Sequence, residues 1–219
     1  LKNEKLLKFT NNNDQLFSII KNFKLFEILY KSLSHNKYCK KITFTKKKID
    51  FSSYNLIINT DYSNFLSKKI FNKKIVKIYN SLAYSTIIKH EKITNDTAIQ
   101  IFTKKGPLAF LPISNNETSI VYSINNTTLK KKEDITKLIE SYNMKYEIKN
   151  IDKLEIFELK AVSLRSYFKD KILAFGDLIH RVHPLAGQGF NMTIRDIKNL
   201  ILIINNKIAL GLPLDYSVN

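Results

Sequence analysis

The stretch ILAFGDLIHRVHPLAGQGFN, residues 172–191, decides the fold of this 219-residue chain. Its first four residues are apolar and end at Gly176-Asp177, which is typical of a buried strand that runs into a turn. After Gly187-Gln188-Gly189, apolar residues recur at spacings of four and three: Phe190, Ile194, Ile197, Ile201 and Ile204. Such a stripe indicates one apolar face of a helix. The stretch therefore predicts a strand, a glycine-containing loop and a helix, in this order.

The residues of this unit have the chemistry of a ligand site. Glycines at 187 and 189 stand where a backbone approaches a ligand closely or adopts a positive φ. The helix that begins there directs its free N–H groups and partial positive charge towards the loop. Asp177, at the carboxyl end of the strand, would lie where open α/β sheets bind ligands, and an ionised carboxylate accepts hydrogen bonds from a polyol. A flavin fits this pattern, and so does a phosphate or a carboxylate.

The rest of the chain mixes helical and β-type patterns. Phe23 to Leu33 has apolar residues at helical spacing, and Asp134 is placed to cap a second helix over 135–142. Leu56-Ile57-Ile58 is an apolar run that ends in a polar loop, as a buried strand does, and Leu16 to Ile20 is a further strand candidate. Short β-type runs separated by turn residues predict an antiparallel sheet: Ala83–Ile88, Ala98–Phe102, Leu108–Leu111 and Ile120–Ile124.

Composition narrows the class of protein. The formal net charge is +17, but the lysines are scattered and only three arginines occur. Nucleic-acid binding favours clustered, arginine-rich basic residues, so we expect no nucleic-acid partner. The abundance of Lys, Asn and Ile instead indicates an AT-rich genome, with attraction to an anionic membrane surface as the second explanation. No apolar run is long enough for a transmembrane helix, and the single cysteine, Cys39, fits a reducing, cytoplasmic compartment.

The stretch from Gly176 to Asn191, continued by Arg195-Asp196, closely resembles the second FAD-binding motif of the ubiquinone-biosynthesis hydroxylases. These enzymes belong to the flavin aromatic-ring monooxygenases similar to para-hydroxybenzoate hydroxylase. Their pattern runs Gly-Asp-Ala-Ala-His, then His-Pro, then Ala-Gly-Gln-Gly, an Asn, and an Asp on the helix. Residues 106–112 also look like a strand of the family's substrate domain, and Asp61 falls where the family has an Asp-Gly motif. The resemblance spans most of the chain.

The resemblance implies an α/β fold of mixed α+β content. A FAD-binding Rossmann-like domain of the para-hydroxybenzoate hydroxylase type would be interleaved with an antiparallel-sheet substrate domain. Residues 24–70 and 170–219 would form part of the FAD-binding domain, and residues 1–23 and 71–169 the substrate domain. The family's N-terminal strand–GxGxxG–helix unit, which holds the ADP half of FAD, is missing from this sequence. Since the sequence also lacks an initiator Met, we expect it to be truncated.

The resemblance also implies which residues contact FAD: Asp61, Gly176, Asp177, Pro184, Ala186, Gly187, Gln188, Gly189, Phe190 and Asn191. Asp177 would hold the ribityl chain, and the backbone around Gln188 would face the isoalloxazine ring, whose anionic state the helix dipole would stabilise. The sequence departs from the family pattern at Asn59, Thr60, Tyr62, Leu178, Ile179 and Thr193, where smaller residues are usual. Leu178 and Ile179 are expected to crowd the site unless neighbouring residues are smaller.

Three further polar residues of the stretch need an interpretation. His180 and His183 are three residues apart, but no other ligand stands near them and structural zinc takes four. We therefore expect no metal, and expect these imidazoles to pack on the loop and bond to its backbone. Asp196 is a candidate flavin residue, with an ion pair to Arg195 or Lys198 on a solvated face as the alternative.

The implied reaction is the hydroxylation of a polyprenylated phenol in ubiquinone biosynthesis. NAD(P)H reduces FAD, O2 reacts with the reduced flavin, and one oxygen atom passes to the phenol ring. Because the cofactor carries this chemistry, we assign no catalytic residue to the protein. Expected partners are the prenyl phenol, the inner face of a membrane as a peripheral contact, and other ubiquinone-biosynthesis proteins. Two alternatives stay open: another aromatic substrate, and a non-catalytic family member that serves as an assembly or scaffold protein.

Overall fold

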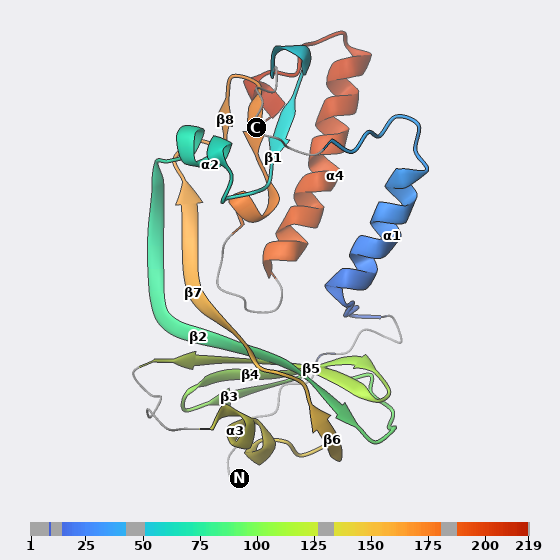
Figure 1. Cartoon of the computed structure of the whole chain (residues 1–219), viewed down its shortest axis with the longest axis vertical. Helices are drawn as coiled ribbons and strands as arrows, with labels where there is room; N and C mark the ends of the chain where they lie inside the picture. The colour runs from blue at the N-terminus through green and yellow to red at the C-terminus, as the bar shows by residue number, and fades with distance from the viewer. Residues whose placement is uncertain (1–8, 10–14, 43–50, 127–133, 181–187, 219) are drawn as a thin grey trace.

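The computed structural model describes residues 9, 15–42, 51–126, 134–180 and 188–218, and the fold is reported for these residues. They form two parts, of which the upper contains a small three-stranded sheet and the lower a six-stranded sheet (Figure 1). Two long paired strands, β2 (Lys74–His90) and β7 (Glu155–Leu164), run side by side from one part into the other. Their pairing shifts register between Ile78 and Leu82, around Asn80 with its φ of +51°, and such irregularities bend strands.

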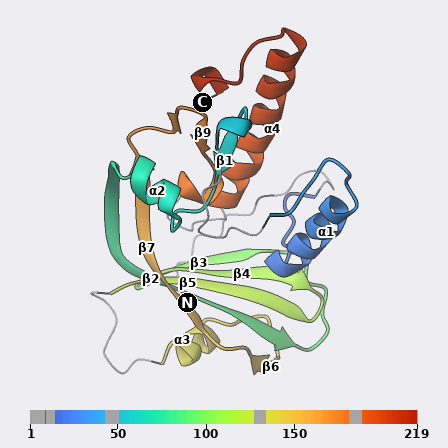
Figure 2. The same ribbon diagram turned by 45° about the horizontal axis from the view of Figure 1, so that its top comes forward.

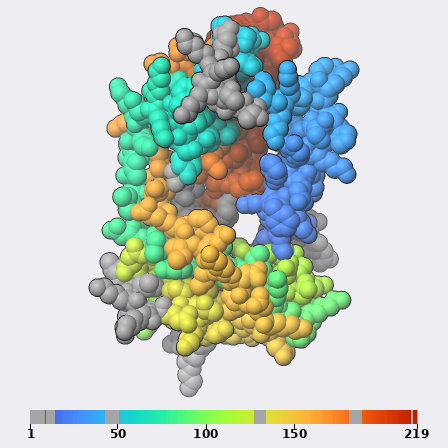
Figure 3. Space-filling view, viewed as in Figure 1, coloured from blue at the N-terminus to red at the C-terminus, as the bar shows by residue number. Residues whose placement is uncertain are grey.

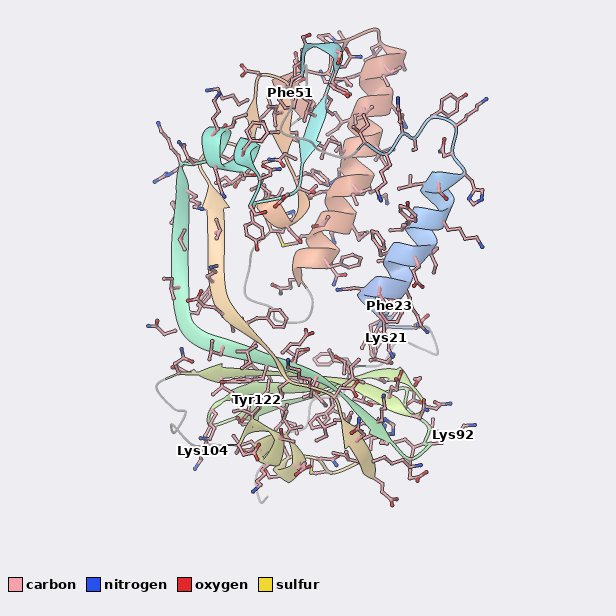
Figure 4. All side chains as sticks on the ribbon, viewed as in Figure 1. Lys21, Phe23, Phe51, Lys92, Lys104 and Tyr122 are labelled. Carbon is pink, nitrogen blue, oxygen red and sulfur yellow. The ribbon has the colours of Figure 1, made fainter. Side chains whose placement is uncertain are left out.

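The lower sheet is antiparallel, with strands in the order β3-β4-β5-β2-β6 and β7 also paired with β2. One face carries the main core, in which Leu108 and Tyr122 are fully buried, and Figure 4 labels Tyr122. Ile135 and Ile139 of α3 belong to this core, so α3 covers the face that points away from the upper part (Figure 2). The remaining elements here are β3 (Ile99–Thr103), β4 (Gly106–Ser114), β5 (Glu117–Asn125), α3 (Ile135–Ser141) and β6 (Ile148–Ile151).

The upper sheet has the order β1-β9-β8, and β1 and β9 are parallel. A small core packs one face of it against α2, and a second one, which contains Leu200, packs it against α4. Three-residue 3-10 turns lie before β1 and at the end of the described chain. The elements of this part are η1 (Phe51–Ser53), β1 (Ile57–Asn59), α2 (Phe65–Ile70), β8 (Phe168–Lys169), β9 (Ile172–Ala174), η2 (Gly176–Leu178), α4 (Gln188–Ala209) and η4 (Tyr216–Val218).

Two helices expose their apolar faces. α1 (Asn22–Ser34) has no buried residue, and α4 buries only Leu200. Figure 1 draws α1 to the right of α4, but Figure 2 shows α1 nearer to the lower sheet, and Phe26 of α1 is 66% exposed. Lys21, which precedes α1 and is labelled in Figure 4, forms a 2.7 Å ion pair with Glu117 of β5. This hydrogen bond lowers the pKa of Glu117 and links α1 to the lower sheet through charge.

The sequence patterns predicted most of these elements. The helix over 23–33 is α1, the strand at 56–58 is β1, and the four β-type runs lie in β2, β3, β4 and β5. Asp134 caps α3 by accepting hydrogen bonds from the amides of Thr136 and Lys137. The strand predicted at Leu16–Ile20 is wrong, because these largely exposed residues pair with no strand in the described part of the chain. The division at residues 23/24, 70/71 and 169/170 stays a prediction.

The apolar helix faces are not membrane spans. Within the described ranges, no helix combines the length and the apolar composition that crossing a bilayer requires.

A buried polar network lies within the lower core. Tyr146 donates from Oη to Asn95 Oδ1 over 3.0 Å, and Asn95 donates from Nδ2 to Thr118 Oγ1 over 2.9 Å. His90 Nε2 lies 3.0 Å from the same Thr118 hydroxyl. Burial raises the pKa of the Tyr146 phenol above its usual range, although a hydrogen bond with Thr118 opposes the shift. Since unpaired buried polar groups are costly, this network stabilises one particular packing of the core.

We expect Tyr146→Phe to lower the free energy of unfolding by about 1–2 kcal/mol at neutral pH, because Asn95 loses a buried donor. The wild-type protein should also lose stability as the pH rises above about 10, since the unfolded chain ionises its tyrosines there while the folded chain resists ionising Tyr146. Urea titrations at neutral and alkaline pH measure both effects. The alkaline loss should be smaller in the variant, and an equal loss in both proteins would contradict this role of Tyr146.

Candidate functional site

The parallel pairing of β1 and β9 brings two polar loops to one edge of the upper sheet. Ile57 pairs with Ile172 and Asn59 with Ala174, so both strands end together. The amide of Phe175 donates to the carbonyl of Asn59 over 2.9 Å, which continues the pairing past the last residue of β9. Thr60-Asp61 and Gly176-Asp177 therefore follow neighbouring strand ends, where open α/β sheets bind ligands.

The turn η2 presents Asp177 to solvent. Gly176 has a φ of +58°, and its carbonyl accepts hydrogen bonds from the amides of Ile179 (3.0 Å) and His180 (2.9 Å). A Cβ on Gly176 would lie 3.7 Å from the methyl groups of both Thr60 and Thr193, so the turn sits between the end of β1 and helix α4. Asp177 itself is exposed, which leaves its carboxylate available to hydroxyl donors.

Asp61 has a local partner at the same edge. Its Oδ1 accepts from the amide and from the hydroxyl of Ser63, each over 2.7 Å. These hydrogen bonds lower the pKa of Asp61, so the carboxylate is ionised at neutral pH. Its backbone carbonyl accepts from Ser67 of α2. Asp61 thus closes the turn that leads into α2, and its predicted contact with FAD stays a prediction.

Helix α4 supplies the predicted positive end. It begins at Gln188, so Gln188, Gly189, Phe190 and Asn191 form its first turn, and Phe190 is 52% exposed. The hydroxyl of Thr193 donates to the carbonyl of Gly189 over 3.0 Å. The amides of a helix's first turn have no intrahelical acceptor and attract negative charge. The predicted contacts Pro184, Ala186 and Gly187, and also His183, lie outside the described residues.

Asp196 pairs with His180, which corrects two expectations. His180 Nε2 and Asp196 Oδ2 form a hydrogen bond between the segment after η2 and the third turn of α4. The alternative of an ion pair with Arg195 or Lys198 is therefore wrong, and the His180 imidazole bonds to a carboxylate rather than to loop backbone. In the described ranges, no group of three or more His, Cys, Asp or Glu side chains is placed to hold a metal ion.

Leu178 and Ile179 do not crowd the site as expected. Leu178 is 4% exposed and belongs to the core between the upper sheet and α2, and Ile179 packs against the same core. The three-residue turn rotates these side chains inwards while Asp177 points out. Asn59, another departure, is buried and donates from Nδ2 to Ser67 Oγ over 2.8 Å, so its side chain fastens β1 to α2. Tyr62 is 54% exposed.

A cavity of about 670 Å³ opens between β7, β9 and α4. Its lining is mostly apolar and includes Val162, Leu173, Phe175, Met192 and Leu200, with His180 and Asp196 on one wall. Among the described residues, none of the predicted FAD contacts lines it. The predicted contacts instead belong to the exposed strand ends and helix start. The space-filling view also shows an opening between α1 and the rest of the molecule, above the lower sheet (Figure 3).

Comparisons with known proteins identify relatives of this arrangement. Residues 69–209 match a protein family described as FAD binding domain. The chain is 24% identical over 204 residues to the mitochondrial ubiquinone biosynthesis monooxygenase COQ6 of Schizosaccharomyces pombe, covering 71% of this chain and 42% of that protein. It is 26% identical over 130 residues to the 3-demethoxyubiquinol 3-hydroxylase of Escherichia coli, covering 57% and 33%. An uncharacterized Synechocystis protein, slr1300, is 27% identical over 124 residues, covering 53% and 30%. The chain thus spans 30–42% of the length of these relatives.

Solved structures share the fold. The flavin-dependent halogenase CmlS aligns with a TM-score of 0.56 at 14% identity, covering 71% of this chain and 31% of that one. Pseudomonas aeruginosa PqsL, in complex with 2-aminobenzoylacetate, aligns with a TM-score of 0.56 at 16% identity, covering 73% and 48%. At these low sequence identities, the structural alignments show a shared fold and nothing more. They confirm the predicted mixed α/β fold of the flavin monooxygenase type.

Proposed function

The chain belongs to the FAD-binding domain family, and on this premise we propose that it supplies the flavin end of the FAD site in an aromatic hydroxylase. The observation that supports this proposal is that the ends of β1 and β9 lie next to helix α4. This arrangement combines an exposed carboxylate at a strand end, a turn at Gly176, and the free amides of the first turn of α4. A ribityl chain needs hydrogen-bond acceptors, and a ring that gains negative charge needs donors. The strand ends supply the acceptor, and the first turn of α4 supplies the donors.

In this proposal the strand-end turn and the first turn of α4 have separate roles. Asp177 accepts hydrogen bonds from the ribityl hydroxyls, and the first turn of α4 around Gln188 and Gly189 faces the ring. Bound FAD would supply the redox chemistry and the activation of O2, with NAD(P)H as the reductant. The protein orients the ring and excludes water, so no catalytic side chain is assigned. Residues 24–70 and 170–219 would hold FAD, and residues 1–23 and 71–169 the substrate.

The proposed substrate is a polyprenylated phenol on the route to ubiquinone. Support comes from the names of two relatives, a ubiquinone biosynthesis monooxygenase and a 3-demethoxyubiquinol 3-hydroxylase. A substrate with a long apolar tail would bring the protein to the inner face of a membrane as a peripheral contact, and to other proteins of the same route.

The visible absorption spectrum of the purified complete gene product tests the function. Bands of oxidised flavin that NAD(P)H bleaches, with hydroxylated product formed from a prenyl phenol in the presence of O2, would support it. A flavin that NAD(P)H reduces without product from any phenol would favour the scaffold alternative. A protein that stays colourless after FAD is added would contradict the flavin site itself.

A further inference from the structure

Two side chains that have no role in the proposed chemistry join the strand-end turn to helix α4. His180 follows η2, and Asp196 lies in the third turn of the helix. Their hydrogen bond connects Nε2 of the imidazole with Oδ2 of the carboxylate. The side chain of His180 is only 11% exposed and that of Asp196 34%. The imidazole side of the contact is therefore shielded from solvent, while the carboxylate keeps partial contact with water.

Both ends of this hydrogen bond are anchored close to the proposed flavin contacts. On one side, the amide of His180 donates to the carbonyl of Gly176 over 2.9 Å, within the turn that presents Asp177. On the other side, Thr193 lies on α4 three residues before Asp196, with its methyl 3.7 Å from where a Gly176 Cβ would stand. A movement of α4 away from the turn must therefore break the bond between His180 and Asp196.

We propose that His180 and Asp196 are a positioning pair that sets the separation of the Asp177 carboxylate from the first turn of α4. The proposal rests on the proposed flavin function. The proposed role requires no contact with FAD: the pair lines a cavity, whereas Asp177, Gln188 and Gly189 are not among the residues that line it. The pair holds the turn of Asp177 and the first turn of α4 at a fixed distance before FAD binds. Such preorganisation improves affinity because less conformational entropy is lost when the ligand binds.

A double-mutant cycle in the complete gene product tests the pair. His180→Ala and Asp196→Ala are each expected to raise the dissociation constant for FAD about tenfold, and the double variant should raise it by about the same factor, because both changes remove one coupling. Quenching of flavin fluorescence measures the affinity, and the melting temperature of the flavin-free protein measures stability. Asp196→Asn keeps an oxygen that accepts from an imidazole N–H, so it should restore most of the affinity.

Asp215→Asn is the matched control. It weakens a second charged contact on the same helix, the 3.1 Å pair of Lys207 Nζ and Asp215 Oδ1 at the far end of α4, and should leave the affinity for FAD unchanged. Effects of the two alanine substitutions that add up would overturn the proposal. So would a lower melting temperature with unchanged affinity, which is the result of a purely structural contact. A wild-type protein that binds no FAD would overturn the proposed function first, and this inference with it.

Discussion

A Gly106→Ala protein is expected to lose about 3–5 kcal/mol of its free energy of unfolding, a large part of the stability of an ordinary domain. Gly106 opens β4 with a φ of +141°, a conformation that side chains disfavour. A Cβ there would lie 2.0 Å from the carbonyl oxygen of Ser123 on β5. Because this oxygen belongs to a neighbouring backbone, the clash is relieved only if β4 and β5 separate beside the buried Leu108 and Tyr122.

Gly211→Ala separates the clash from the strain of a positive φ. Gly211 has a φ of +66°, and a Cβ at this position would meet open space, with no neighbouring side chain or strand within 4 Å. Gly211 lies two residues after α4, where its amide donates to the carbonyl of Ile208 and the amide of Leu212 donates to the carbonyl of Lys207. This substitution should lower the free energy of unfolding by about 1 kcal/mol, which is the cost of a positive φ at a residue with a side chain. Urea unfolding of both variants measures their free energies of unfolding. Similar losses in the two would contradict the prediction, because they would show that β5 can move away from a Cβ at position 106 without loss of stability.

Local sequence patterns were sufficient to predict the strand and the helix of the strand–loop–helix stretch at 172–209. The apolar run before Gly176, the glycines, and the three-and-four spacing after Phe190 each depend on near neighbours in the chain, and β9 and α4 follow them. The pairing of β9 with β1 joins segments far apart in the sequence. The apolar run at 56–58 predicted the strand β1 but not its partner, and the family resemblance assigned both segments to one domain without predicting this pairing.

The direction of individual side chains could not be predicted from spacing. Leu178 next to Asp177 reads as part of the same exposed loop, but a three-residue 3-10 turn sends it into the core. Asp196 stands beside Arg195 in sequence, so a surface ion pair was a reasonable expectation. Its partner is His180 because the turn after β9 packs on that face of α4. A His after the strand end and an Asp on the helix, within one strand–loop–helix unit, was the available signal.

Asp177→Ala is expected to weaken FAD binding by about 1.5–3 kcal/mol, the worth of hydrogen bonds to a charged group. At about 1.4 kcal/mol for each factor of ten, the dissociation constant should rise roughly 10- to 150-fold. The carboxylate is exposed, so the variant should fold normally and change the free energy of unfolding by about 0.5 kcal/mol or less. Titration of the flavin-free protein, followed by flavin fluorescence, measures the constant.

Two further substitutions identify what the carboxylate contributes. Asp177→Asn keeps one oxygen acceptor and removes the charge, so its dissociation constant should fall between those of the wild type and Asp177→Ala. Asp170→Asn alters an exposed carboxylate just before β9, at the opposite edge of the sheet, and Asn tolerates its φ of +57°. Because only the carboxyl end of β9 faces the proposed ribityl chain, Asp170→Asn should bind FAD like the wild type. Equal weakening by Asp170→Asn would mean that the overall charge of the sheet, rather than the strand-end position of Asp177, attracts the cofactor. Unchanged affinity in Asp177→Ala would remove the ribityl contact from the proposal.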